Sequence, residues 1–404
     1  MKVLQVNCVY KKGSTGKITF DLHNGLLERD VESVVCYGRG QKESNAYKTC
    51  TEVEANLTHI LSKLTGVLYG GGLFSTGRLI RLIKKQKPDI VHLQCINGYF
   101  VNIYRLLSWL GKHRVPTVLT LHAEFMYTGS CGYALDCNAW KETTGCQNCP
   151  IWKQETESIF GNNTARAWKK MKKAFEKMPK DRTRIVSVSP WLYERAKASE
   201  ILRDFHHCVV MNGLNTEVFK PTRQGNSLVQ KENEKFTVFH ATAFFSKEKE
   251  HIKGGFYLLQ LAEKMKKENV HFYVAGPYED GLQVPDNVTL LGAITDQQEL
   301  AKYYSQADVT LLTSKWETFS MVCAESLCCG TPVVGFRAGA PETISLPEYS
   351  TFVPYGDINA LEMAVQDTIQ KATPKEDFSK MAANIYDTAK MVDGYLKVYN
   401  DLLS

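Results

Sequence analysis

The chain alternates strand-like and helix-like segments along nearly its whole length, and this alternation limits the folds that it can adopt. Short apolar runs rich in β-branched residues are each followed by a stretch with helical periodicity. The first half has such runs at 2–7, 32–37, 89–95, 117–122, 184–189 and 207–211, and the second half at 236–242, 270–275, 288–291, 308–313, 332–336 and 351–353. Strands that alternate with helices form parallel sheets, so the sequence predicts an α/β protein.

The same pattern occurs twice, which predicts two domains of similar design. With 404 residues, of which 44% are hydrophobic, the chain is long enough to bury two cores. Residues 215–235 are polar and contain Pro221, Gly225 and Asn226, so they are the predicted linker. We therefore expect an N-terminal domain at 1–214, a C-terminal domain at 236–380 and a helical stretch at 381–404.

Two glutamates, Glu317 and Glu325, flank a predicted junction between a strand and a helix. Glu317 follows the strand, at the sheet edge where open α/β sheets bind ligands. The amides of the residues that begin the helix favour a phosphate; these residues are Phe319, Ser320 and Met321. Glu325, more than one turn further on, would accept hydrogen bonds from a ribose diol. The segment thus fits a nucleotide diphosphate sugar, although a helix-end charge and a solvated glutamate are the simpler interpretation of such a pair taken alone.

Together with Lys253 in the segment 251–255, this glutamate pair resembles the motifs of the retaining glycosyltransferases of family 4, and the resemblance runs nearly end to end. It implies the GT-B fold, in which two Rossmann-like domains face each other across a donor cleft and the final helix returns to the N-terminal domain. It also implies that Glu317 contacts the donor sugar, Glu325 holds the ribose and Lys253 binds the diphosphate. The base would lie on the loop at Ile294. The family usually has an arginine shortly before this lysine, and none follows the strand at 236–242 here.

The N-terminal half supplies further candidates at the ends of its predicted strands. Gly13, Ser14, Thr15 and Gly16 belong to a loop at 11–17 between the first strand and the first helix, where amides approach a phosphate or acceptor closely; a tight structural turn is the alternative. By resemblance, this loop lines the donor cleft and His122 touches the donor sugar. Arg39 would meet an anionic acceptor, or be an exposed loop arginine. Asn97 and Tyr99 would shape the acceptor side.

Four of the twelve cysteines lie close together in the sequence. They are Cys131, Cys137, Cys146 and Cys149, in a predicted insertion at about 124–155. Thiolates at this spacing in a cytoplasmic chain favour a structural zinc site over disulfides, and uncoordinated thiols are an equal alternative.

Basic residues gather in the N-terminal half, although the net charge is only +6. Residues 166–184 contain nine Lys or Arg and two acidic residues, and a second basic stretch at 78–87 follows the apolar segment 64–74. An apolar stripe at helical spacing, with Trp168, Met171 and Phe175, suggests an interfacial helix at an anionic membrane; a core-facing stripe is the alternative. No apolar run approaches the ~20 residues of a membrane span and no signal peptide is recognised, so we expect a cytoplasmic protein at the inner face of the membrane.

These features predict a retaining glycosyltransferase that transfers a sugar from a nucleotide diphosphate sugar to a saccharide acceptor, in surface polysaccharide synthesis. The acceptor would be lipid-linked, and the absence of D-x-D from the sequence predicts no catalytic metal. The alternatives are a GT-B nucleotide-sugar epimerase, an inactive relative that only binds sugar nucleotides, and, more remotely, a zinc-containing nucleic-acid-binding module. Few aromatic residues interleave the basic run, so no nucleic-acid partner is expected.

Overall fold

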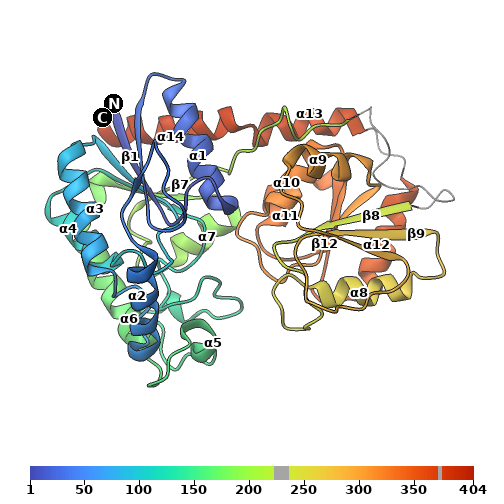
Figure 1. Cartoon of the computed structure of the whole chain (residues 1–404), viewed down its shortest axis with the longest axis horizontal. Coiled ribbons are helices and arrows are strands. Elements are labelled where there is room, and N and C mark those ends of the chain that lie inside the picture. Colours follow the sequence, from blue (N-terminus) through green and yellow to red (C-terminus); the bar gives the residue numbers. More distant parts are fainter. Residues whose placement is uncertain (223–235, 372–374) are drawn as a thin grey trace. The chain divides into compact units, whose positions relative to one another are not determined.

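The computed structural model describes residues 1–222, 236–371 and 375–404, which form two compact units. Unit 1 comprises Met1–Met211 and Met391–Ser404, and unit 2 comprises Asn212–Lys390. Each unit contains one parallel β-sheet with helices packed on it (Figure 1). The predicted α/β class with two Rossmann-like domains is therefore confirmed. Most of the predicted linker, 223–235, lies outside the described residues.

The sheet of unit 1 has seven parallel strands in the order β3-β2-β1-β4-β5-β6-β7. The strands are β1 (Lys2–Asn7), β2 (Glu32–Tyr37), β3 (Tyr47–Lys48), β4 (Ile90–Leu93), β5 (Thr117–Leu121), β6 (Thr183–Ser187) and β7 (His206–Val209). The central strands are buried along their length because helices cover both faces of such a sheet, and this explains their continuous apolar runs. The strand order reverses between β1 and β4, which places a topological switch point there.

The helices of unit 1 come mostly from its N-terminal part. They are α1 (Gly13–Leu27), α2 (Glu52–Thr65), α3 (Leu73–Gln86), α4 (Ile103–Lys112), α5 (Trp152–Thr156), α6 (Thr164–Phe175), α7 (Pro190–Ala198) and, after unit 2, α14 (Thr388–Leu403). The Tyr399 hydroxyl on α14 lies 2.8 Å from Nδ1 of His92 in β4, and Val392 packs against Gly25 of α1, where a Cβ would approach it to 2.4 Å. The C-terminal helix is thus part of the core of unit 1.

The predicted final helical stretch is interrupted. The structure has two helices, α13 (Lys375–Tyr386) in unit 2 and α14, and Asp387 separates them. The Asp387 carboxylate accepts a hydrogen bond from the Ala389 amide at 2.7 Å, so it caps the new helix in place of an intrahelical carbonyl.

The apolar stripe of α6 packs inward. Trp168, Met171 and Phe175 are each at most 2% exposed, while Arg166 and Lys170 on the same helix are exposed. The core-facing alternative for this stripe is therefore confirmed and the interfacial helix is wrong, because these side chains are buried by packing in unit 1, in part against α4. Among the described residues, no helix is long and apolar enough to cross a membrane.

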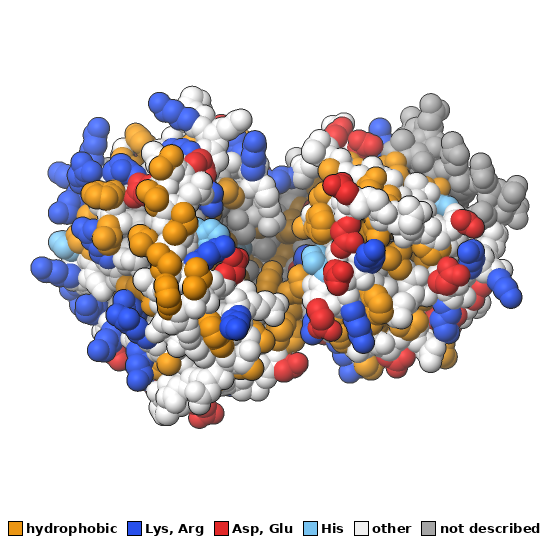
Figure 2. Space-filling view, turned by 60° about the horizontal axis from the view of Figure 1, so that its bottom comes forward, with side chains coloured by type: hydrophobic (Ala, Val, Ile, Leu, Met, Phe, Trp, Pro, Cys, Tyr) orange, Lys and Arg blue, Asp and Glu red, His pale blue; other side chains and the backbone are white. Residues whose placement is uncertain are grey.

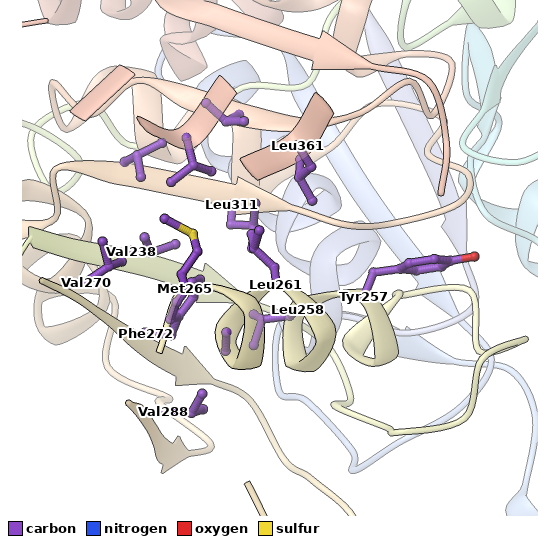
Figure 3. Packing of buried hydrophobic residues seen from close by; sticks show 14 of the residues in the cluster. Val238, Tyr257, Leu258, Leu261, Met265, Val270, Phe272, Val288, Leu311 and Leu361 are labelled. Carbon is purple, nitrogen blue, oxygen red and sulfur yellow. The ribbon is translucent and has the colours of Figure 1, made fainter. Parts of the chain in front are cut away.

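Unit 2 has six parallel strands in the order β10-β9-β8-β11-β12-β13. They are β8 (Phe236–Ala241), β9 (Val270–Ala275), β10 (Val288–Gly292), β11 (Val309–Leu312), β12 (Val333–Phe336) and β13 (Ser350–Val353). The other helices are α8 (Gly255–Lys264), α9 (Gln297–Gln306), α10 (Met321–Cys328), α11 (Pro341–Ile344) and α12 (Ile358–Gln370). Figure 3 shows the core between the sheet and α8, where Leu258, Leu261 and Met265 meet strand residues such as Val238 and Phe272. A fully buried side chain of this kind contributes roughly 1.5–3 kcal/mol to stability.

Candidate active site

The topological switch point of unit 2 brings two of the predicted residues together. The strand order reverses between β8 and β11, so the segments that follow these strands leave the same sheet edge side by side. The segment after β8 carries Lys253 and the segment after β11 carries Glu317. Lys253 Nζ donates to Glu317 Oε1 at 2.7 Å, with side chains 26% and 13% exposed. A cation and a carboxylate, far apart in sequence, thus form one partly buried pair at the ligand-binding edge.

Close backbone contacts hold Lys253 in place. The Thr313 hydroxyl donates to the Lys253 carbonyl at 3.1 Å, and the Lys315 amide donates to the Ile252 carbonyl at 2.8 Å. Gly254, with φ of +67°, precedes α8, and a Cβ there would lie 2.0 Å from the Thr313 carbonyl oxygen. Only glycine allows the segment to approach β11 this closely.

Glu317 is anchored on its other side by the segment that follows β12. Its amide donates to the Ala338 carbonyl at 2.8 Å, and its carbonyl accepts from the Ala340 amide at 3.1 Å. Glu342 accepts from the amides of Ala338 and Gly339 at 3.2 Å each, which fixes that segment in turn. The carboxylate of Glu317 is therefore presented from a backbone that hydrogen bonds hold on two sides.

Helix α10 begins at Met321, four residues after Glu317. Ser320 precedes it with φ of +81°, and its hydroxyl accepts from the Cys323 amide at 3.3 Å, which caps the helix. Phe319 is 4% exposed and meets the Tyr386 ring edge-on at 6.3 Å, so it anchors the turn in the core. The first-turn amides, including that of Met321, lack intrahelical acceptors and carry the positive end of the helix dipole. Phosphate binding at this terminus stays a prediction.

Glu325 lies further along α10 and has a partner that the sequence did not indicate. The buried Tyr304 hydroxyl, on α9, donates to Glu325 Oε2 at 3.1 Å. Burial, and then the Glu325 charge, raises the pKa of Tyr304 well above its ordinary value, so the phenol remains a donor. Tyr304 thereby orients one carboxylate oxygen of Glu325. Tyrosines at this spacing look like ordinary core residues, so no sequence signal marks this role.

Ile294 and His240 are two further residues near this sheet edge of unit 2. Ile294 is half-buried in the segment that follows β10. His240 of β8 is buried, and its Nδ1 donates to the Leu311 carbonyl at 2.9 Å. Burial first, and then the Lys253 charge, lowers the pKa of His240 to about 4, so it is neutral at pH 7. The arginine that the family usually has before Lys253 is absent. The basic residues closest to its expected place in the sequence are Lys247 and Lys249, and both are exposed.

In unit 1, the segments after β1 and β4 meet at the switch point of the first sheet. The Cys8 amide donates to the Cys95 carbonyl at 2.8 Å, and Gly98 lies against Cys8. Helix α1 begins at Gly13, so Ser14, Thr15 and Gly16 form its first turn. The expected loop at 11–17 is therefore wrong in its extent: a hydrogen bond from the Lys11 amide to the Gly16 carbonyl at 3.0 Å closes the turn onto the helix. The helix start still lies at the ligand-binding edge of the sheet.

The remaining candidates of unit 1 follow neighbouring strands of the same sheet. Asn97 and Tyr99 follow β4, and the Tyr99 ring stacks on His59 at 4.4 Å. His122 directly follows β5; burial lowers its pKa to about 4, so it is neutral. Arg39 follows β2 and donates to Glu52 of α2 at 3.1 Å. Parallel strands end at one edge, so these residues share it, but Arg39 is already paired with a carboxylate.

The four clustered cysteines line one cavity of about 430 Å³ in unit 1. The thiols of Cys131 and Cys149 are hydrogen-bonded to each other, and this contact lowers the pKa of Cys149 below its ordinary value. The Cys146 sulfur accepts from the Gly129 amide at 3.2 Å. Within the described residues, no group of three His, Cys, Asp or Glu side chains is already arranged to hold a metal ion. The zinc site stays a prediction, and its four cysteines line one cavity.

Comparison with known proteins identifies the family of the chain. Residues 15–218 match the model of the family described as Glycosyltransferase Family 4, and residues 240–371 match that of Glycosyl transferases group 1. WcaC of Escherichia coli (strain K12), provisionally named a colanic acid biosynthesis glycosyl transferase, is 24% identical over 421 residues, covering 100% of both chains.

Solved structures share the fold over the whole chain. Sucrose-phosphate synthase from Thermosynechococcus elongatus superposes with a TM-score of 0.66 at 14% identity, covering 100% of this chain and 99% of that one. Anabaena HepE in complex with UDP-glucose gives 0.63 at 14% identity, with 99% of each chain covered. These likenesses establish the GT-B class, with its two Rossmann-like domains. Because the family model spans half of the sequence, the chain belongs to glycosyltransferase family 4.

Proposed function

We propose that this chain is a retaining, metal-independent glycosyltransferase that moves a sugar from a nucleotide diphosphate sugar to a lipid-linked saccharide. The observation that carries the proposal is the Lys253–Glu317 pair at the switch point of unit 2, beside the start of α10. Lys253 and the α10 amides would neutralise the departing diphosphate, while Glu317 would orient the sugar. Glu325, oriented by Tyr304, would accept hydrogen bonds from the ribose, and the base would rest near Ile294.

In this reaction the bond between the anomeric carbon and the diphosphate oxygen breaks, and a bond from an acceptor hydroxyl oxygen forms on the same face. The hydroxyl proton passes to the departing diphosphate, so no protein base is needed. We assign the acceptor to unit 1, at the sheet edge that carries Asn97 and Tyr99. His122 at the same edge would touch the donor sugar. The name of WcaC supports a role in polysaccharide biosynthesis, and the UDP-glucose bound to HepE supports a nucleotide sugar donor.

A thermal-shift screen without divalent metal tests the proposal. UDP-, GDP- and ADP-sugars are compared, and one of them should raise the melting temperature, because a ligand at about 100 times its Kd adds roughly 2.7 kcal/mol to stability. Glu325→Ala should lose this shift. Glu348→Ala, an exposed glutamate elsewhere in unit 2, is the matched control and should keep it. No shift with any donor would instead favour the inactive relative, and conversion of the donor to an epimer without acceptor would favour the epimerase.

For the cysteine cluster we propose structural zinc, which would tie together the insertion at 124–155. Its support is that all four cysteines line one cavity, together with the amide-to-sulfur bond at Cys146, a contact that stabilises a thiolate. Elemental analysis should find one zinc per chain, and Cys146→Ser/Cys149→Ser should lower it to background. Protein without zinc whose four thiols all react freely would end this proposal.

A further inference from the structure

Helix α2 carries its large apolar side chains on the exposed face and small or polar side chains on the buried face, the opposite of a usual surface helix. Its buried positions are small or polar: Ala55, Thr58 and Ser62. Its large apolar side chains point outward, and their exposed fractions are 70% for Val53, 57% for Leu57, 54% for Ile60, 53% for Leu61 and 39% for Leu64. Exposing such an apolar stripe to water is unfavourable. The outer face of α2 is therefore suited to contact with an apolar phase outside the protein.

The packing of unit 1 explains why the inner face of α2 is small. The Gly72 amide donates to the Thr58 hydroxyl at 3.0 Å, and a Cβ on Gly71 would lie 2.2 Å from the Thr58 methyl. The backbone at 70–72 therefore runs directly against α2 and leaves no room for large side chains. Thr51 caps one end of α2 and Gly66, with φ of +61°, ends it, so the helix is held without its apolar stripe.

The exposed apolar residues of α2 continue onto its neighbours. Leu73 and Phe74, at the start of α3, are 54% and 80% exposed, and with Leu57 and Leu61 they line a groove of about 380 Å³. Ile159 and Phe160 are 66% and 73% exposed, and the Ile159 amide donates to the Lys63 carbonyl at the end of α2. We call this set the α2 surface: Leu57, Ile60, Leu61, Leu64, Leu73, Phe74, Ile159 and Phe160.

Basic side chains border the α2 surface. Arg166 and Lys170 of α6 line the same groove, and Lys169 and Lys173 follow on the exposed side of that helix. Among the described residues that line the groove, Glu54 is the one carboxylate, and it is already bound by Arg78 and by the Ser75 amide. Figure 2 shows hydrophobic side chains gathered on unit 1 with Lys and Arg around them. The α6 side of the border is therefore cationic.

We infer that the α2 surface inserts into an anionic lipid bilayer, with the α6 cations at the lipid phosphates. Apolar side chains surrounded by Lys and Arg match the two layers of a bilayer leaflet, hydrocarbon inside and anionic headgroups outside. A second copy of this chain fits less well, because two cationic borders would repel each other. The inference rests on the proposed function in one respect only: the lipid-linked saccharide that is proposed as the acceptor would lie at such a surface.

Vesicle co-sedimentation tests the inference, with phosphatidylcholine vesicles prepared with and without phosphatidylglycerol. The full chain should bind the mixed vesicles and prefer them strongly. Leu57→Ser/Leu61→Ser/Phe74→Ser should weaken partitioning roughly tenfold or more, because three inserted side chains are lost. Lys169→Glu/Lys170→Glu/Lys173→Glu should abolish the preference for phosphatidylglycerol, since each cation contributes roughly fivefold (about 1 kcal/mol) near an anionic surface.

Matched controls lie in unit 2, where Met363→Ser changes a side chain that is 62% exposed and Lys302→Glu reverses an exposed charge. Both should bind vesicles like the parent. Absence of parental binding, or equal binding by the triple serine variant, would overturn the inference. A parental dimer that the serine variant dissolves would make the surface a protein interface and overturn it as well. Donor-induced thermal shifts should be unchanged in all variants, so failure here is distinct from failure of the proposed function.

Discussion

A buried ion pair in unit 1 gives a quantitative test of the structure. The Glu124 carboxylate is completely buried, and Arg195 Nε on α7 donates to it at 2.6 Å. The Tyr127 hydroxyl and the Ala134 amide donate to it as well, at 2.8 and 2.7 Å. The Arg195 guanidinium also lies 4.9 Å from the ring of Trp140. One carboxylate therefore fastens the start of the cysteine-containing insertion to α7.

Glu124→Gln keeps the shape and removes the charge. Breaking a buried pair by neutralising one partner costs about 3–5 kcal/mol, because the other charge stays buried. The Arg195 side chain is 15% exposed, so water reaches it and the lower end, about 3 kcal/mol, applies. In a unit of this size each kcal/mol shifts the melting temperature by about 2–4 °C, which predicts a loss of roughly 6–12 °C.

Urea unfolding followed by tryptophan fluorescence measures the loss in the free energy of unfolding, expected to be about 3 kcal/mol. Five of the six tryptophans belong to unit 1, so the signal reports mainly on that unit. Asp181→Asn is the control, since its ion pair with Arg114 is exposed on both sides and should change stability by less than about 1 kcal/mol. The double variant Glu124→Gln/Arg195→Met should lose less than the sum of the single variants. If Glu124→Gln is as stable as the Asp181→Asn control, the buried pair does not have the role argued above.

Three further predictions concern the site and the pH dependence of stability. Glu317→Ala should lower kcat while leaving nucleotide affinity nearly unchanged, whereas Glu325→Ala should weaken nucleotide binding. Titration calorimetry measures the affinity and initial rates give kcat. The reverse pattern would exchange the roles of the two glutamates. Lys253→Met should reduce turnover at saturating donor by at least tenfold, because one charge facing the leaving group is lost; unchanged turnover would remove Lys253 from the mechanism. Burial raises the pKa of Asp21 to about 6, so the folded state binds its proton more tightly than the unfolded chain and this contribution is lost as pH rises through 6. Asp21→Asn should therefore be more stable than the parent at pH 8, by about 1–2 kcal/mol, and equal to it near pH 4; a gain that is the same at both pH values would argue against this titration.

The strands were predictable because the physics that forms them is local. Each central strand of a parallel sheet is buried on both faces, so it reads as an unbroken apolar run, and the predicted limits differ from the observed ones by at most two residues. Strand β3 was not predicted, since two residues at a sheet edge leave no pattern. The break at Asp387 was also missed, because helical periodicity continues on both sides of it.

The direction in which a helix faces was less predictable than its existence. The stripe of α6 and the stripe of α2 look alike in sequence, yet Trp168 is buried and Leu57 is 57% exposed. What decides between them is the space left by other segments, here the glycine-rich backbone against Thr58. Contacts across long sequence distances decide the site in the same way: Tyr304 reaches Glu325 only after α9 and α10 have packed.

The Lys253–Glu317 pair bears on how a site without the family's usual arginine could handle a diphosphate. Without donor, the charge of Lys253 is balanced by a carboxylate 2.7 Å away. On the proposed function, an arriving diphosphate carries more negative charge than Glu317 and competes for the same ammonium, with the α10 amides adding to the attraction. Lys253 would then turn towards the phosphates, and the released Glu317 carboxylate would become an acceptor for the sugar hydroxyls. Recognition of the diphosphate and of the sugar would thus be coupled through one ion pair, and a nucleotide lacking the sugar would leave Glu317 unsatisfied. The same coupling explains why Glu317 should matter more for turnover than for nucleotide affinity.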